Sequence, residues 1–119
     1  MLHLIGIPNC NKIKDTRSWL DDKGISYEFI NVKKEPLSKD ELSELAHKVG
    51  LDVLVNNRGT TYRKLGVKEM QPSETELLDL AHAHQNMLKR PILVLEESVL
   101  VGYDEQAFES FAREHELLS

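Results

Sequence analysis

The sequence has a single cysteine, Cys10, among its 119 residues. One thiol cannot form an intramolecular disulfide, and it cannot supply a multi-cysteine zinc site. No apolar run approaches the roughly 18 residues that a membrane-spanning helix needs, and the first six residues lack the basic segment that begins a signal peptide. These absences predict a soluble, cytoplasmic protein that does not contact a membrane.

Basic charge is also scarce. Asp and Glu number 20 against 15 Lys and Arg, so the formal net charge is -5. This balance argues against broad nucleic-acid binding, which depends on basic surfaces. The 40% apolar and 29% charged residues are ordinary globular values. We therefore expect a monomeric single domain that spans residues 1–119 and has no nucleic-acid partner.

The first third of the chain predicts a strand, a helix and a second strand. Residues 2–7 are largely apolar, and Pro8 and Asn9 then mark a turn. Apolar residues share one helical face from about residue 11 to 23, where Gly24 follows as a typical helix end. Residues 27–32 form the second strand. Because the links are short, we expect the two strands to be parallel.

The middle of the chain predicts two helices, each opened by a capping box. The pairs are Ser38 with Glu41 and Ser73 with Glu76, in which the hydroxyl and the carboxylate each accept an N–H that the helix leaves unpaired. The polar, basic and glycine-bearing segment 55–65 between them predicts a loop.

The last third predicts strands at 91–95 and 99–101 in an antiparallel hairpin, and then a helix capped by Asp104. The whole order fits an α/β protein with a four-stranded mixed sheet flanked by helices. This is the thioredoxin-like plan with a helical insertion at about residues 37–88.

Cys10 falls between the end of the first strand and the start of the first helix. A lone cysteine is most often a small buried apolar residue. A helix N-terminus, however, has unpaired N–H groups and a partial positive charge that stabilise a thiolate. Lys12 and Lys14 add positive charge nearby. The position of Cys10 therefore leaves a structural and a chemical role equally open.

Two arginines are candidates for binding an anion beside such a thiolate. Arg58 lies in the basic segment and Arg90 directly precedes Pro91 and the third strand. Guanidinium groups bind carboxylates and oxyanions in a bidentate manner. The sequence alone does not bring either arginine to Cys10, and each can also be a solvated surface charge.

Two sharper motifs are excluded by spacing. A phosphatase-type loop needs an arginine six residues after the cysteine, where this chain has Thr16, with Arg17 one residue too late. A dithiol redox site needs a second cysteine three residues on, where this chain has Ile13. If Cys10 is redox-active, its partner sulfur must come from another molecule.

The histidines do not predict a metal site. His82 and His84 are two residues apart, so their side chains diverge on a helix. We expect no bound metal and no tightly bound cofactor.

Three blocks in order resemble the ArsC/Spx superfamily, and most closely its YffB-like branch. They are residues 6–14 (GIPNCNKIK), 57–65 (NRGTTYRKL) and 89–94 (KRPILV). The resemblance covers essentially the whole chain and implies a thioredoxin-like fold with an inserted helical subdomain. It implies that Cys10 is the nucleophile, that Arg58 and Arg90 reach the site, and that the Arg90–Pro91 bond is cis. Asn11, Lys12 and Pro91 are the remaining residues expected to contact substrate or glutathione.

The chain also departs from two groups in this superfamily. Glutaredoxin-coupled arsenate reductases have a histidine four residues before the nucleophile and a third arginine after the last strand; this chain has Gly6 and the segment Val101-Gly102-Tyr103. Spx-type regulators, which bind the RNA polymerase alpha subunit, commonly use a Cys-x-x-Cys switch that Ile13 removes.

Three functions follow from the resemblance. The first is a glutathione-dependent monothiol reductase that acts on a small anionic or thiol substrate, with glutathione as co-substrate. The second is an arsenate reductase that uses glutaredoxin as a partner. The third, of another class, is a non-catalytic regulator that binds RNA polymerase.

Overall fold

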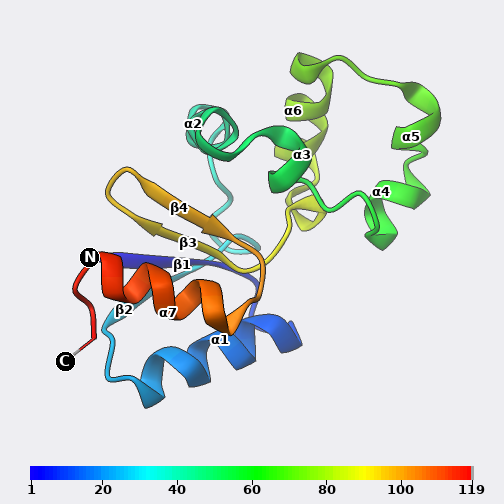
Figure 1. Ribbon diagram of the computed structural model, residues 1–119. Helices are drawn as coiled ribbons and strands as arrows, with labels where there is room; N and C mark the ends of the chain where they lie inside the picture. Colours follow the sequence, from blue (N-terminus) through cyan, green and yellow to red (C-terminus); the bar gives the residue numbers. More distant parts are fainter. Residues whose placement is uncertain (119) are drawn as a thin grey trace. The chain divides into compact units, whose positions relative to one another are not determined.

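The computed structural model describes residues 1–118 and divides them into two compact units (Figure 1). The first unit joins Met1–Asn31 to the chain from Arg90 onwards, and the second is Val32–Lys89. The helical segment expected at about 37–88 lies within the second unit.

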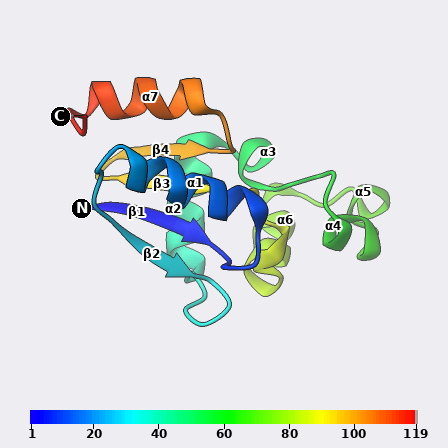
Figure 2. The ribbon, with the colours of Figure 1, turned by 90° about the horizontal axis from the view of Figure 1, so that it is seen from below.

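The first unit is built on a four-stranded mixed sheet (Figure 2). Its strands are β1 (Leu2–Gly6), β2 (Tyr27–Asn31), β3 (Ile92–Leu95) and β4 (Ser98–Val101), in the order β2-β1-β3-β4. β1 and β2 are parallel, and β3 is antiparallel to both β1 and β4. The predicted strands are confirmed to within one residue at most ends. Pro91 precedes β3 because it has no N–H to donate to the ladder.

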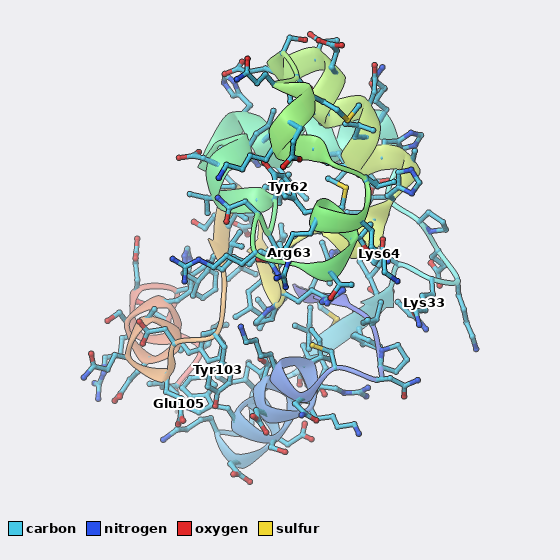
Figure 3. All side chains as sticks on the ribbon, turned by 90° about the vertical axis from the view of Figure 1, so that its right-hand side faces the viewer. Lys33, Tyr62, Arg63, Lys64, Tyr103 and Glu105 are labelled. Carbon is cyan, nitrogen blue, oxygen red and sulfur yellow. The ribbon has the colours of Figure 1, made fainter. Side chains whose placement is uncertain are left out.

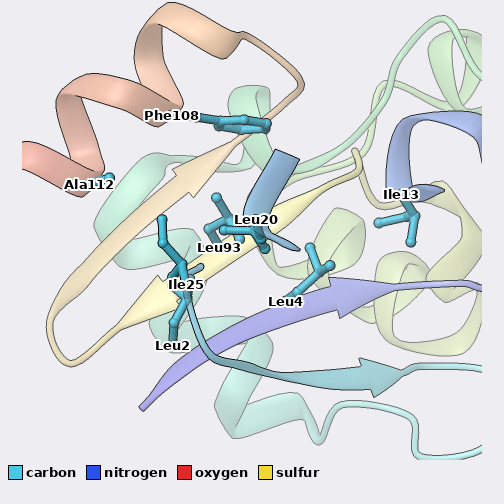
Figure 4. Close-up of a cluster of buried hydrophobic side chains, with 8 residues drawn as sticks. All are labelled: Leu2, Leu4, Ile13, Leu20, Ile25, Leu93, Phe108 and Ala112. Carbon is cyan, nitrogen blue, oxygen red and sulfur yellow. The ribbon is translucent and has the colours of Figure 1, made fainter. Parts of the chain in front are cut away.

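Two helices, α1 (Asn11–Asp22) and α7 (Glu105–Glu114), cover one face of this sheet. Leu2 and Leu4 alternate with the less buried His3, so both point to the same side of β1. Figure 4 shows the buried cluster that they form with residues of both helices. Its members are Leu2, Leu4, Ile13, Leu20, Ile25, Leu93, Phe108 and Ala112. The first unit therefore has its own core and the predicted thioredoxin-like plan.

The regular elements of the second unit are helices, and one isolated antiparallel β-bridge pairs Val55 with Leu88. Its elements are α2 (Lys39–Val49), α3 (Leu51–Leu54), α4 (Thr60–Lys64), α5 (Val67–Met70), α6 (Glu74–Ala83) and the 3-10 turn η1 (Gln85–Met87). Both predicted capping boxes are present, at the start of α2 and of α6. The Gln85 side chain accepts a hydrogen bond from the Leu37 N–H (2.8 Å) and donates one to the Leu37 carbonyl (2.7 Å). This pair ties the start of the unit to its end.

The prediction of a loop over residues 55–65 is wrong in its second half, where α4 forms. The sequence conceals this helix because β-branched Thr60 and Thr61 favour helix weakly and no side chain caps its start. Packing inside the unit, with α5 beside it, supplies what local propensity does not.

Across residues 1–118, no helix is long and apolar enough to cross a membrane.

The capping box of α6 makes a testable contribution to stability. Glu76 accepts the Ser73 backbone N–H (3.0 Å) and donates its own N–H to the Ser73 hydroxyl (3.2 Å), and these bonds lower the pKa of Glu76 below its ordinary value of 4.5. A carboxyl group whose pKa is lower in the folded state than in the unfolded state stabilises the fold at any pH above its unfolded-state pKa. That stabilisation is lost as the pH falls through the folded-state pKa. We expect urea unfolding to show the wild type to be more stable than Glu76→Gln at pH 7, with the gap narrowing below pH 4.5.

The matched control is the same substitution in a Ser73→Ala background, which removes the hydroxyl that accepts the Glu76 N–H and that helps to lower the pKa of Glu76. The backbone N–H that donates to the Glu76 carboxylate remains. There the loss of stability caused by Glu76→Gln should be smaller at pH 7. If Glu76→Gln in the chain with Ser73 lowers the stability by the same amount at every pH from 7 to 3, this account is contradicted.

Candidate functional site

Cys10 occupies the N-cap position of α1. Its backbone is extended (φ -118°, ψ 127°), and its carbonyl accepts the first helical hydrogen bond, from the Lys14 N–H (3.0 Å). The thiol is free and half-buried, and it packs against the buried cluster of the first unit. The sequence prediction that Cys10 stands at the start of the helix is confirmed.

The surroundings of the Cys10 thiol favour negative charge. Asn11 and Lys12 are the first two helical residues and are both exposed. The first turn of α1, all of which is described, contains no acidic side chain. The N-terminal end of α1, where Cys10 is the N-cap, thus has the partial positive charge of a helix start and the exposed Lys12 close by in the chain.

Arg90 and Pro91 lie at the same end of the sheet as the loop that leads to Cys10. Ile92 pairs with Ile5, so Pro91 lies level with Gly6, where β1 ends. The Arg90–Pro91 peptide bond is cis, as expected, and the Pro91 carbonyl accepts the Gly102 N–H (2.8 Å). Among residues 1–118, Arg90 Nη1 is buried and has no hydrogen-bond acceptor. An unpaired guanidinium nitrogen of this kind can bind an anion.

Gly6 and Ile13 fit against each other closely. A Cβ atom added to Gly6 would come within 2.8 Å of Ile13 Cγ1, and closer still to the Cδ1 methyl group. Ile13 is fully buried. Any side chain at position 6 therefore requires the end of the Ile13 side chain to shift within the core.

Tyr103 follows β4, where the arsenate reductases have their third arginine. Its hydroxyl donates to Glu105 Oε2 (3.1 Å), and Figure 3 labels both residues. Its ring meets that of Phe108 edge-on, with the ring centroids 5.2 Å apart. Partial burial, followed by Glu105 and then Asp15, raises the pKa of Tyr103. The segment after β4 thus has acidic neighbours and no guanidinium group.

Arg58 belongs to the second unit and lines a cavity of about 680 Å³ inside it. The Arg58 N–H donates to Asn56 Oδ1 (3.2 Å), and its carbonyl accepts Arg63 Nη2 (3.2 Å). These bonds shape the turn that enters α4, while the Arg58 side chain stays exposed. The structure brings the Cys10 loop and Arg90 to one end of the sheet in the first unit. Arg58 belongs to the second unit.

Sequence reasoning missed the other residues of this cavity, which are Asn57, Tyr62, Arg63, Lys68 and Glu69. The basic character of segment 55–65 was a signal for part of this set. It could not distinguish Arg63, which lines the cavity, from its neighbour Lys64, which does not. Lys68 and Glu69 are on α5, a short helix that the sequence did not predict.

Within residues 1–118, no group of three or more His, Cys, Asp or Glu side chains is arranged to hold a metal ion.

Comparison with known proteins identifies the family. The sequence model of the ArsC family matches residues 5–111. The global transcriptional regulator Spx of Bacillus subtilis is 30% identical over 113 residues, which cover 93% of this chain and 86% of that protein. An uncharacterized protein of Haemophilus influenzae is 32% identical, over 92% of this chain and 97% of its own.

Solved structures agree with this assignment. The structure described as the YFFB protein has a TM-score of 0.88 and 29% identity over the whole of both chains. An arsenate reductase (ArsC) related protein from Brucella melitensis has a TM-score of 0.77 and 33% identity over 92% of each chain. The family thus includes proteins named for arsenate reductase and proteins named as transcriptional regulators. The chain belongs to the ArsC family and, within the ArsC/Spx superfamily, to the YffB-like branch.

Proposed function

We propose that the protein is a glutathione-dependent monothiol reductase. The observation that carries the proposal is the free Cys10 thiol at the N-cap of α1, beside Lys12 and without an acidic side chain in the described first turn. A buried structural cysteine needs neither the helix terminus nor the basic neighbour. A nucleophilic thiolate is stabilised by both.

The reaction needs only one protein sulfur. The Cys10 thiolate attacks the glutathione sulfur of a mixed disulfide R–S–S–G, the S–S bond breaks, and R–S⁻ leaves and takes a proton from water. Cys10 is then disulfide-bonded to glutathione. A second glutathione thiolate attacks the glutathione sulfur of that bond, which releases oxidised glutathione and restores the Cys10 thiolate. In sum, the mixed disulfide R–S–S–G and one glutathione are converted to the thiol R–SH and oxidised glutathione.

The remaining site residues have binding roles in this proposal. Lys12 supports the thiolate, and Asn11 adds amide groups for hydrogen bonds beside it. The unpaired Nη1 of Arg90 binds an anionic group of the substrate or a glutathione carboxylate. Pro91 presents backbone at the same end of the sheet. Arg58, in the second unit, is proposed as a further substrate-binding cation. No tightly bound cofactor takes part.

Exposure to oxidised glutathione tests the proposal directly. We expect intact-mass spectrometry to show one glutathione added to the wild type and none to Cys10→Ser, and added glutathione should then remove the adduct. Lys12→Gln should slow the modification about two- to fivefold, the range for one exposed charge interaction. Lys23→Gln, at the other end of α1, is the matched control and should leave the rate unchanged. A wild-type thiol that stays unmodified would refute the proposal.

An arsenate reductase is the second candidate, favoured by the Brucella melitensis relative. Two observations weigh against it. Ile13 fills the space that a histidine at position 6 would need, and Tyr103 with Glu105 stands where a third arginine would bind the oxyanion. Both differences remove positive charge from an anion-binding site.

An assay with arsenate, glutathione and glutaredoxin therefore has a clear expected outcome. The wild type should reduce arsenate no faster than Cys10→Ser does. Turnover that depends on Cys10 would instead establish the second candidate and would show that neither the histidine nor the third arginine is required.

A regulator that binds RNA polymerase is the third candidate, favoured by the Spx relatives. This chain lacks the second cysteine of a Cys-x-x-Cys switch. Ile13 stands at that position and is buried. We expect immobilised protein to retain no RNA polymerase alpha subunit above a blank resin, whether or not Cys10 has been oxidised. Specific retention would transfer the assignment to this class.

A further inference from the structure

The cavity that Arg58 lines adjoins a second one in the helical unit. The second cavity has a volume of about 400 Å³, and its walls include Asp52 at the start of α3 and Glu74 at the start of α6. Asn57 and Tyr62 belong to the walls of both cavities. The two cavities therefore share this pair of lining residues within a single unit, and we call the two together the two-part depression. Their volumes are in the usual range for sites that bind small molecules.

The two ends of this depression have opposite charge. The first cavity has three cations, Arg58, Arg63 and Lys68, against the single carboxylate of Glu69. The acidic residues of the second are Asp52 and Glu74, and its described wall contains no lysine or arginine. Because the whole chain has a net charge of -5, the basic end is a local feature that departs from the general surface. A concave surface also concentrates the field of the charges that line it.

These charges do not neutralise one another. Within residues 1–118, no ion pair within 4.0 Å joins any of these cations to any of these carboxylates. Arg63 donates one guanidinium N–H to the Arg58 carbonyl (3.2 Å). The positive and the negative side chains thus line different cavities, and Asn57 and Tyr62 line both.

We infer that the two cavities together bind a short peptide. Its carboxylate lies among Arg58, Arg63 and Lys68, and its amino-terminal ammonium lies near Asp52 and Glu74. The Asn57 amide and the Tyr62 hydroxyl, which lie where the cavities meet, hydrogen-bond to the peptide group between. A free amino acid is a poorer fit, because its two charges are adjacent whereas the charged groups here line separate cavities.

The inference goes beyond the proposed redox chemistry, because every residue in it belongs to the helical unit and none is Cys10. Arg58 is the one residue that both proposals use, and the variants below leave it unchanged. Trialanine has one ammonium at one end and one carboxylate at the other, so it is the first probe. The S-methyl derivative of glutathione is the second probe, and it has no thiol and cannot form a disulfide. Its γ-glutamyl end carries a carboxylate beside the ammonium, so we expect it to bind less tightly than trialanine at the acidic end.

Titration calorimetry on the Cys10→Ser chain measures this binding alone. We expect saturable binding of at least one probe, weakened about two- to fivefold by Lys68→Gln at the basic end and by Glu74→Gln at the acidic end. Asp52→Asn repeats the acidic test on another helix, in case one variant folds poorly. Lys64→Gln and Glu44→Gln remove equal charges in the same unit outside both cavities and should have no effect.

The N-acetylated probes lack the ammonium group. They should bind more weakly and should no longer respond to Glu74→Gln. Failure of both probes to bind would overturn the inference. Inorganic phosphate that binds as tightly as the peptides, or tight peptide binding that ignores both acidic substitutions, would also overturn it and leave a simple anion site. An adduct on Cys10 without peptide binding, or peptide binding without an adduct, shows which of the two proposals has failed.

Discussion

The close contact between Gly6 and Ile13 is the constraint on which the Cys10 site depends. Because Gly6 has no side chain, the end of β1 can approach the first turn of α1, and the three residues that follow Gly6 turn the chain so that Cys10 becomes the N-cap. Gly6 and Ile13 also occupy the two positions where related proteins have a histidine and a second cysteine, respectively. One packing arrangement thus positions the thiol and also restricts the chemistry around it.

The neighbouring strand contributes the other half of the site through its register. Pairing of Ile5 with Ile92 brings Arg90 and Pro91 to the end of β1, although they lie far from Cys10 in the sequence. The buried cluster stabilises this arrangement, because Ile13 on α1 and Leu93 on β3 both belong to it. The Arg90 guanidinium and the Cys10 thiol, for which we propose anion binding and nucleophilic attack, are in this way attached to two elements that share one hydrophobic cluster.

The helical unit is organised by hydrogen bonds that close it on itself. Gln85 bonds to both backbone groups of Leu37, and the backbones of Leu54 and Asn56 bond to those of Lys89 and Met87. Short helices of weak intrinsic stability can persist inside such a closed frame. They hold several charged side chains around the two cavities, where we propose that the unit binds a peptide. A shared fold can carry different functions through the side chains placed on it.

The sequence by itself determined the strands, the long helices and their starts, because alternation, helical spacing and the boxes at Ser38 and Ser73 are local patterns. It also placed Cys10 at a helix start and excluded a second cysteine within the chain. Only the tertiary structure decided that Arg90 shares an end of the sheet with the Cys10 loop, that α4 is helical, and that Arg63 lines a cavity while Lys64 does not. Those facts depend on strand register and on packing between distant residues, and the order of residues along the chain does not encode either in a form that local patterns reveal.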